Sequence, residues 1–277
     1  FHNNNFKSKI NIKKLNKTNI STRDLNKKGF SRFFLKEIND TEIFLKRTIS
    51  NYLDLKKNKI KNMENLFSNK IKKSLVNSKI KNIIFTGMGS CYTAGVGISK
   101  YLSDKLENLN ISNIKVEATI ASEGSGFYLS KNMSDTIIVV IAQSGTTIDT
   151  NVFAKMAKSR GAYTISLANK RDGDITYLVE NNLYLGNGRD VELSVPSTKT
   201  YTCHLYLGFI LADKIASIFK NKHKTEIFKN SNKILKQNYI SDLVSKHEKI
   251  INVLNFDITK YKKWILVYDD SMNAYNS

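Results

Sequence analysis

Apolar and polar positions follow one another along the chain in blocks that predict strands and helices in alternation. Five consecutive β-branched residues at 137–141 indicate a strand that is buried on both faces, as in a parallel sheet. The polar residues 143–147 follow directly, and apolar residues then recur at helical spacing from Ile148. Four more short apolar runs predict further strands, at 82–86, 114–118, 163–167 and 183–185.

Helical periodicity fills the intervals between these strands. We expect helices over about 92–106, from 148 onward and over 198–219, two helices before the first strand, at about 33–53 and 63–76, and one or two amphipathic helices at 224–254. Strands that alternate with helices indicate an α/β fold. The prediction is a three-layer α/β/α sandwich with a mainly parallel, doubly wound, flavodoxin-like sheet of about five strands.

The pattern also divides the chain into segments. We expect a linker or disordered lead-in at 1–30, a helical segment at 31–75, the α/β domain at 76–220, a helical connection at 221–258 and the truncated start of a second such domain at 259–277. The last segment rests on the apolar run Trp264–Tyr268 and the polar loop after it. A domain does not end after one strand, and the chain begins with Phe1, so we expect a piece of a longer protein.

The formal net charge of +20 changes the picture little. Lysine accompanies Asn and Ile throughout the chain, which indicates solvated helix faces, and no nucleic-acid-binding motif accompanies it. The two cysteines form no disulfide framework, the longest apolar stretch (205–212) is too short to span a bilayer, and the N-terminus lacks a signal-peptide pattern. We therefore expect a cytoplasmic protein with neither a nucleic-acid nor a membrane partner.

Three loops at the predicted carboxyl ends of strands carry the candidate chemistry: Gly87–Tyr92, Ala142–Thr147 and Ser194–Lys199. Ligands of open α/β sheets bind at such ends, near the point where the strand order reverses. Each loop brings hydroxyl or thiol side chains and free backbone N–H groups to the start of a helix. This combination predicts a phosphate site that needs no metal.

Other interpretations of these residues are open. Ser and Thr at helix starts are often plain N-caps. Gly87 and Gly89 are compatible with a dinucleotide site, but Tyr92 stands where a third glycine is needed. The histidines lack metal-ligand spacing, so we expect neither metal nor cofactor, and we interpret His204 as a satisfied core residue. A thiol at a helix start can have a lowered pKa, but no histidine is visibly paired with Cys91, which we interpret as a ligand contact.

Four motifs resemble the SIS (sugar isomerase) domain family: Gly89-Ser90-Cys91-Tyr92, Ala121-Ser122-Glu123, the stretch Ala142–Thr150 and Val195-Pro196-Ser197-Thr198-Lys199. Within that family they are most like the first SIS domain of the glutamine–fructose-6-phosphate aminotransferases (isomerising). The segment Gly29–Ile38 is similar to the one that joins the glutaminase and isomerase parts of those enzymes.

The resemblance implies a set of phosphosugar contacts, namely Ser90, Cys91, Gln143, Ser144, Thr147, Val195 and Ser197. Of these, Ser144, Thr147 and Ser90 would hold the phosphate. The chain departs from the family pattern at Ala142 and Thr146, where Ser and Glu are usual, and at Cys91, where Ser is usual. The absence of a hydroxyl at Ala142 would weaken the binding free energy by about 1 kcal/mol.

The function that the resemblance implies is formation of glucosamine 6-phosphate from fructose 6-phosphate and glutamine-derived ammonia, by a homodimer. The glutaminase domain and most of the second SIS domain are absent from this sequence, so the chain alone is expected to be inactive. No acid–base residue is assigned from the sequence; Glu123 is the nearest candidate, and we interpret it as structural. The alternatives are another phosphosugar isomerase, deaminase or deglycase with two SIS domains, or a non-enzymatic sugar-phosphate sensor.

Overall fold

A parallel β-sheet forms the centre of the computed structural model, which describes residues 26–193, 197–220 and 226–238 and isolated positions between 242 and 249. The five strands are β3 (Asn82–Gly87), β4 (Lys115–Ile120), β5 (Thr136–Ala142), β6 (Tyr163–Ala168) and β7 (Asn181–Tyr184). They lie in the order β4-β3-β5-β6-β7 and pair in parallel throughout. The predicted doubly wound, flavodoxin-like α/β fold is confirmed.

Strand β5 lies in the middle of the sheet, and every one of its residues is buried. Ile137, Val139 and Ile141 pack into the apolar cluster on one face. Ile138, Val140 and Ala142 pack into a second cluster on the other face. The run of β-branched residues therefore reflects burial on both sides, as predicted from the sequence.

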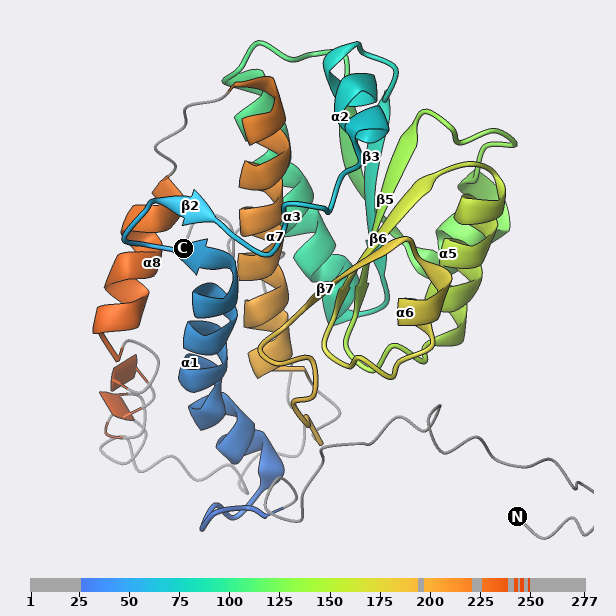
Figure 1. Cartoon of the computed structure of the whole chain (residues 1–277). Coiled ribbons are helices and arrows are strands. Elements are labelled where there is room, and N and C mark those ends of the chain that lie inside the picture. Colours follow the sequence, from blue (N-terminus) through green and yellow to red (C-terminus); the bar gives the residue numbers. More distant parts are fainter. Residues whose placement is uncertain are drawn as a thin grey trace, which may run out of the picture.

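Helices cover both faces of the sheet (Figure 1). One face is covered by α3 (Ser90–Glu107) and α7 (Lys199–Phe219), and α1 (Phe33–Tyr52), α2 (Asn69–Val76) and α8 (Glu226–Lys236) also join this side. The other face is covered by α4 (Ala121–Glu123), the π-helical turn η2 (Gly124–Tyr128), α5 (Ile148–Ser159) and α6 (Ile175–Leu178). A short antiparallel pair, β1 (Leu53–Asp54) and β2 (Lys59–Ile60), follows α1.

Helix α7 is the one helix of the described residues that is long and apolar enough to cross a membrane by length and composition. In the structure it packs against α1 and α3 instead (Figure 1). Leu207, Ile210 and Leu211 are fully buried there. Its apolar composition is thus that of a core helix.

The structure differs from the sequence expectations at two points. The helix predicted at 63–76 begins only at Asn69, because the Ser68 hydroxyl accepts a hydrogen bond from the N–H of Ile71 at 3.3 Å and caps it. Met63 and Phe67 are buried from irregular backbone, which gave the segment its helical appearance. The hairpin of β1 and β2 was not predicted. The expected lead-in up to residue 25 and the second domain at 259–277 lie outside the described residues.

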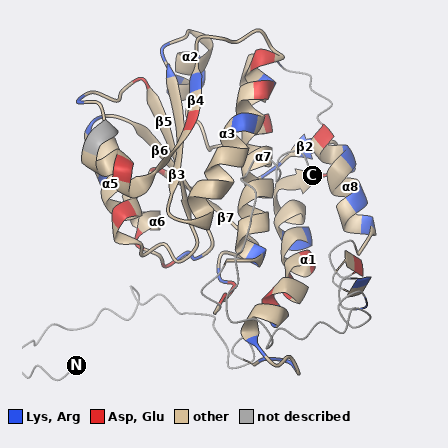
Figure 2. Ribbon diagram, turned by 180° about the vertical axis from the view of Figure 1, so that it is seen from behind, with Lys and Arg blue, Asp and Glu red and all other residues tan. Residues whose placement is uncertain are grey.

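Charged residues are distributed over the described surface rather than gathered on one element. Figure 2 shows basic residues on several helices, α1 and α8 among them, with acidic residues interspersed. Some pairs are helical neighbours, as in Lys46–Glu42 at 2.7 Å and Lys100–Asp104 at 2.6 Å. Such pairs contribute little to stability but keep the helix faces solvated.

Candidate functional site

The loops after β3 and β5 meet where the strand order reverses. From β3 the chain crosses to β4 on one side and then to β5 on the other, so α3 and α5 leave the sheet on opposite faces. Ligands of doubly wound folds bind at this position. A cavity of about 330 Å³ opens there.

The cavity is lined by six of the seven residues proposed from the sequence: Ser90, Cys91, Gln143, Ser144, Thr147 and Ser197. The seventh, Val195, lies outside the described residues. The lining also includes Glu192 and Thr150, which sequence reasoning missed. Glu192 precedes the predicted Ser194–Lys199 loop by only two positions, and that proximity was the available signal. Glu123 is exposed and is not part of the lining.

Two helix N-termini reach the cavity without a side-chain cap. Gly89, at φ 54°, is the N-cap of α3, and Thr147 is the N-cap of α5. Neither residue bonds a first-turn N–H with its side chain, so the plain N-cap interpretation does not hold for Thr147. First-turn N–H groups carry the positive end of the helix dipole and favour an anion.

Ser144 has a defined hydrogen-bonding direction. Its hydroxyl oxygen accepts from the N–H of Thr146 at 3.3 Å and from the Thr146 hydroxyl at 3.1 Å. With both bonds entering the oxygen, the Ser144 proton remains available for donation. Ser144 therefore presents a donor beside the start of α5.

The Gln143–Thr147 loop is packed tightly against a second loop. Gly145 has φ +74°, and a Cβ there would lie 2.8 Å from the Cα of Gly173. The Gly145 carbonyl accepts from the N–H of Ile175 at 3.0 Å and from the Asn151 side chain at 3.3 Å. Gly145 and Gly173 allow the two backbones to approach, and this contact fixes Ser144 in place.

Glu192 organises the third wall of the cavity. One carboxylate oxygen accepts from the N–H of Thr198 at 2.9 Å and from its hydroxyl at 3.2 Å. The other oxygen accepts from the hydroxyl of Thr200, which is in turn 2.5 Å from the hydroxyl of Ser197. Glu192 is only 8% exposed. A carboxylate at the start of α7 also suits the helix dipole.

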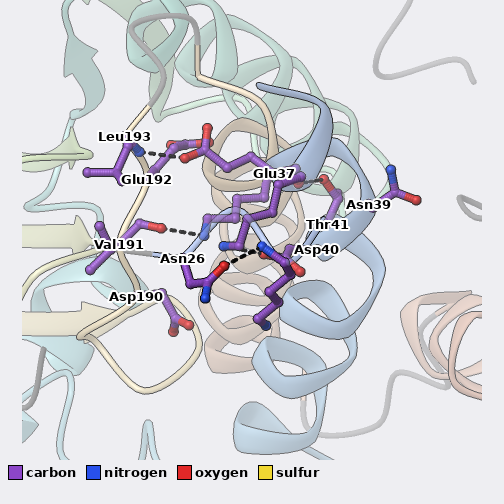
Figure 3. Close-up of polar contacts among 12 residues, drawn as sticks. Asn26, Glu37, Asn39, Asp40, Thr41, Asp190, Val191, Glu192 and Leu193 are labelled. Atoms are coloured by element: carbon purple, nitrogen blue, oxygen red, sulfur yellow. Dashed lines mark hydrogen bonds and ion pairs between the residues drawn. The ribbon is translucent and has the colours of Figure 1, made fainter. Parts of the chain in front are cut away.

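The segment around Glu192 is also held by α1, by the first residue of α7 and by Asn169, which follows β6. Figure 3 shows Glu37 of α1, whose carboxylate accepts from the N–H of Leu193. The buried amine of Lys199 donates to the carbonyl of Val191 at 2.6 Å. The side chain of Asn169 donates to the carbonyl of Asp190 at 2.9 Å. Lys199 of the Ser-Thr-Lys motif thus supports the segment and does not line the cavity.

Cys91 lies in the cavity wall as a neutral thiol. Burial raises its pKa to about 11, and the negative charge of Glu192 adds to the rise. The N–H of Gln143 acts in the opposite direction but does not offset burial. A lowered pKa at this helix start is therefore excluded, and Cys91 is a buried, neutral thiol in the cavity lining.

His204 of α7 is fully buried, as expected for a core residue, but it is not satisfied. Both ring nitrogens lack a hydrogen-bond partner among the described residues. Burial lowers its pKa to about 4, although the nearby carbonyls of Leu167 and Ala142 favour the protonated form. The ring is thus neutral near pH 7. The core position expected of His204 is confirmed, and neither ring nitrogen has a hydrogen bond of ordinary geometry among the described residues.

Among the described residues, the lining carries one formal charge, the carboxylate of Glu192, and no lysine or arginine. A bound anion would therefore rely on helix N-termini, backbone N–H groups and hydroxyls. In the part of the chain that the structure describes, no group of three or more His, Cys, Asp and Glu side chains is arranged to hold a metal ion.

Comparison with known proteins agrees with this geometry. Residues 77–212 match the family model described as the SIS domain. The chain carries an SIS domain. Two curated relatives of this SIS domain are glutamine–fructose-6-phosphate aminotransferases (isomerising), from Clostridium tetani (35% identical, 67% of this chain and 28% of the relative) and Fusobacterium nucleatum (30% identical, 82% and 35%). The chain thus spans about a third of the length of the curated relatives it matches.

Solved structures share the fold of this SIS domain. The C-terminal domain of glucosamine-fructose-6-phosphate aminotransferase from Francisella tularensis superposes with a TM-score of 0.61 at 22% identity, over 76% of this chain and 55% of that one. An Escherichia coli protein solved in complex with a phosphosugar superposes with a TM-score of 0.50 at 14% identity, over 70% and 93% of the two chains.

Proposed function

We propose that this chain binds a phosphorylated sugar, fructose 6-phosphate, in the cavity between the ends of β3, β5 and α7. The observation that carries the proposal is the convergence of Ser90, Ser144, Thr147 and Ser197 on one cavity at the switch point of the sheet. The four hydroxyls come from three loops that are far apart in the sequence. If these hydroxyls served only as helix caps, nothing would require them to lie in one cavity.

The start of α5 is the proposed phosphate end of this cavity. Thr147 has no side-chain capping bond, and Ser144 retains a free proton for donation. The α5 dipole adds a favourable field for a dianion. The name of the curated relatives includes fructose 6-phosphate, which supports the choice of sugar. The Escherichia coli neighbour solved with a phosphosugar supports a ligand of this class.

We further propose that the chain is the first SIS domain of a cytoplasmic, homodimeric enzyme like glutamine–fructose-6-phosphate aminotransferase (isomerising), which forms glucosamine 6-phosphate. Both cysteines are free thiols, which suits the cytoplasm. Moving a proton between two sugar carbons needs an acid and a base. Glu192 is the one carboxylate in the described lining, and both its oxygens already accept hydrogen bonds. We therefore assign the chemistry to groups outside this cavity wall, with a second SIS domain as their proposed source.

A titration of the 277-residue chain with fructose 6-phosphate, glucosamine 6-phosphate and unphosphorylated fructose tests the proposal, by calorimetry and thermal shift. The two phosphosugars are expected to bind and fructose is not. Ser144→Ala and Thr147→Val should each weaken binding by about fivefold, the equivalent of about 1 kcal/mol for one lost hydroxyl. Ser159→Ala removes a hydroxyl at the far end of α5 and should leave binding unchanged.

The same sample, supplied with fructose 6-phosphate and ammonium, is expected to form no glucosamine 6-phosphate. If the folded chain binds none of the phosphosugars, the proposed site is refuted. Formation of the amino sugar by this chain alone would refute the assignment of the chemistry to other groups.

A further inference from the structure

We propose that Glu192 is a positioning residue that makes Ser197 a hydrogen-bond acceptor and thereby sets the direction in which a phosphosugar lies in the cavity. The inference rests on the proposed function. It concerns a chain of contacts from Ser197 through Thr200 to Glu192, all at the start of α7.

The direction of the hydrogen bonds follows from the number of protons. A carboxylate can only accept, so the Thr200 hydroxyl must donate its single proton to Glu192. The contact of 2.5 Å between the hydroxyls of Thr200 and Ser197 then has one arrangement, in which Ser197 donates to Thr200. Ser197 has no proton left, and only its oxygen lone pairs can face the cavity.

Thr200 is fully buried, and Glu192 is 8% exposed. Water therefore does not readily replace either partner. The protein itself fixes the direction of the hydrogen bonds from Ser197 through Thr200 to Glu192. Thr198 donates its N–H and its hydroxyl to the other carboxylate oxygen, which holds Glu192 in one orientation.

Two parts of the cavity lining consequently differ in character. Ser144 presents a proton beside the start of α5, whereas Ser197 and Glu192 present only acceptors and a negative charge. A phosphate dianion is itself an acceptor and is repelled by a carboxylate. A sugar hydroxyl can donate as well as accept, so it suits Ser197, whereas a phosphate dianion can only accept. The phosphate is thereby directed to Ser144, and the hydroxylated carbons are directed to Ser197.

Replacing Glu192 by Gln is a nearly isosteric change that tests this series of hydrogen bonds. The Gln oxygen can keep the bond from Thr198, while its NH₂ group donates to Thr200. Thr200 must then donate to Ser197, and the Ser197 proton turns toward the cavity. The affinity for fructose 6-phosphate, relative to that for inorganic phosphate, is expected to fall about tenfold in Glu192→Gln, with phosphate binding itself unchanged or tighter.

Two further variants separate positioning from damage to the fold. Glu37→Gln alters another buried carboxylate that holds the same segment from α1, and it should leave the ratio of the two affinities unchanged. Thr200→Val removes the link between Ser197 and Glu192 and should lower the ratio as Glu192→Gln does. In a Ser197→Ala background, Glu192→Gln should change the ratio by less than about twofold, since the two residues act through one hydrogen-bond chain.

Each outcome has one meaning. Wild-type protein that binds no phosphosugar refutes the proposed function and this inference together. Wild-type binding with an unchanged ratio in Glu192→Gln, or additive effects of Glu192→Gln and Ser197→Ala, leaves the proposed function standing and overturns the role of Glu192. Equal loss of phosphate and phosphosugar binding in Glu192→Gln indicates a merely structural role and also overturns it.

Discussion

Ser144 and Ser197 are the same residue type in the same cavity, yet their surroundings give them opposite roles. Thr146 donates two hydrogen bonds to Ser144 and leaves it a proton, whereas Thr200 takes the proton of Ser197. Nothing in the sequence distinguishes these two hydroxyls. The difference depends on neighbours that the fold brings together. For Ser197 it begins with Glu192, which accepts the proton of Thr200.

The buried His204 predicts a pH dependence of stability. Its pKa is about 4 in the folded protein, below the ordinary value of 6.5, so the unfolded chain binds the proton first as the pH falls. The free energy of unfolding should therefore be fully present above pH 6.5 and should decrease toward pH 4, by about 3 kcal/mol in all from this residue.

Urea unfolding between about pH 7.5 and about pH 4.5 covers most of this transition and measures most of the decrease. His204→Gln removes the titrating group and should flatten the curve, with little loss of stability at neutral pH because both ring nitrogens are already unpaired. An equally steep decrease in His204→Gln would show that other groups govern the acid sensitivity.

At the scale of elements, the site depends on the order of the strands. The loop after β3 and the loop after β5 are adjacent because β3 and β5 pair directly, with Thr86 opposite Val140. Their helices, α3 and α5, cover opposite faces of the sheet, which leaves the cavity open between them. The start of α7 is brought to this cavity across the α3 side, as the packing of α7 on α3 requires.

The close packing of α3 on α7 gives an element-scale prediction. A Cβ at Gly208 of α7 would lie 2.2 Å from the Cδ1 of Ile98, which is fully buried in α3. Overpacking of this kind costs about 1–3 kcal/mol and outweighs the gain of about 1 kcal/mol in helix propensity. Gly208→Ala is therefore expected to lower the melting temperature by a few degrees, as calorimetry can measure.

Gly126→Ala is the matched control for this substitution. An added Cβ at Gly126 meets no atom within 4 Å. Gly126→Ala should therefore not lower the melting temperature. Equal or greater stability of Gly208→Ala would show that α3 and α7 can separate without cost.

At the scale of the whole molecule, the outer helix layer is the proposed contact of the homodimer. On α1, Ile43 is 62% exposed, and Phe34 and Leu35 are about 40% exposed. Exposed apolar side chains of this size are common at subunit interfaces. Ile43→Lys is expected to shift the protein from dimer to monomer in analytical ultracentrifugation.

Ile148→Lys provides the control for the dimer prediction. Ile148 is 76% exposed on α5, and α5 covers the opposite face of the sheet from α1. The same change of charge there should leave the dimer intact. A wild-type chain that sediments as a monomer at micromolar concentration would contradict the proposed homodimer of this chain.

The sequence by itself determined the five parallel strands, the helices between them, the likeness to SIS domains and six of the seven proposed contacts that the structure places in one cavity. It could do so because buried faces of helices and strands require apolar residues at a regular spacing. The loops at strand ends carry polar residues of only a few types. These are local properties, and a linear chain displays them directly.

Only the tertiary structure decided the hydrogen-bond directions of Ser144 and Ser197, the raised pKa of Cys91, the unpaired ring of His204 and the role of Glu192. Each of these depends on burial and on partners distant in sequence or on a loop geometry that local pattern does not specify. For Glu192, two threonines convert an ordinary acidic residue into the group that distinguishes one part of the cavity lining from another.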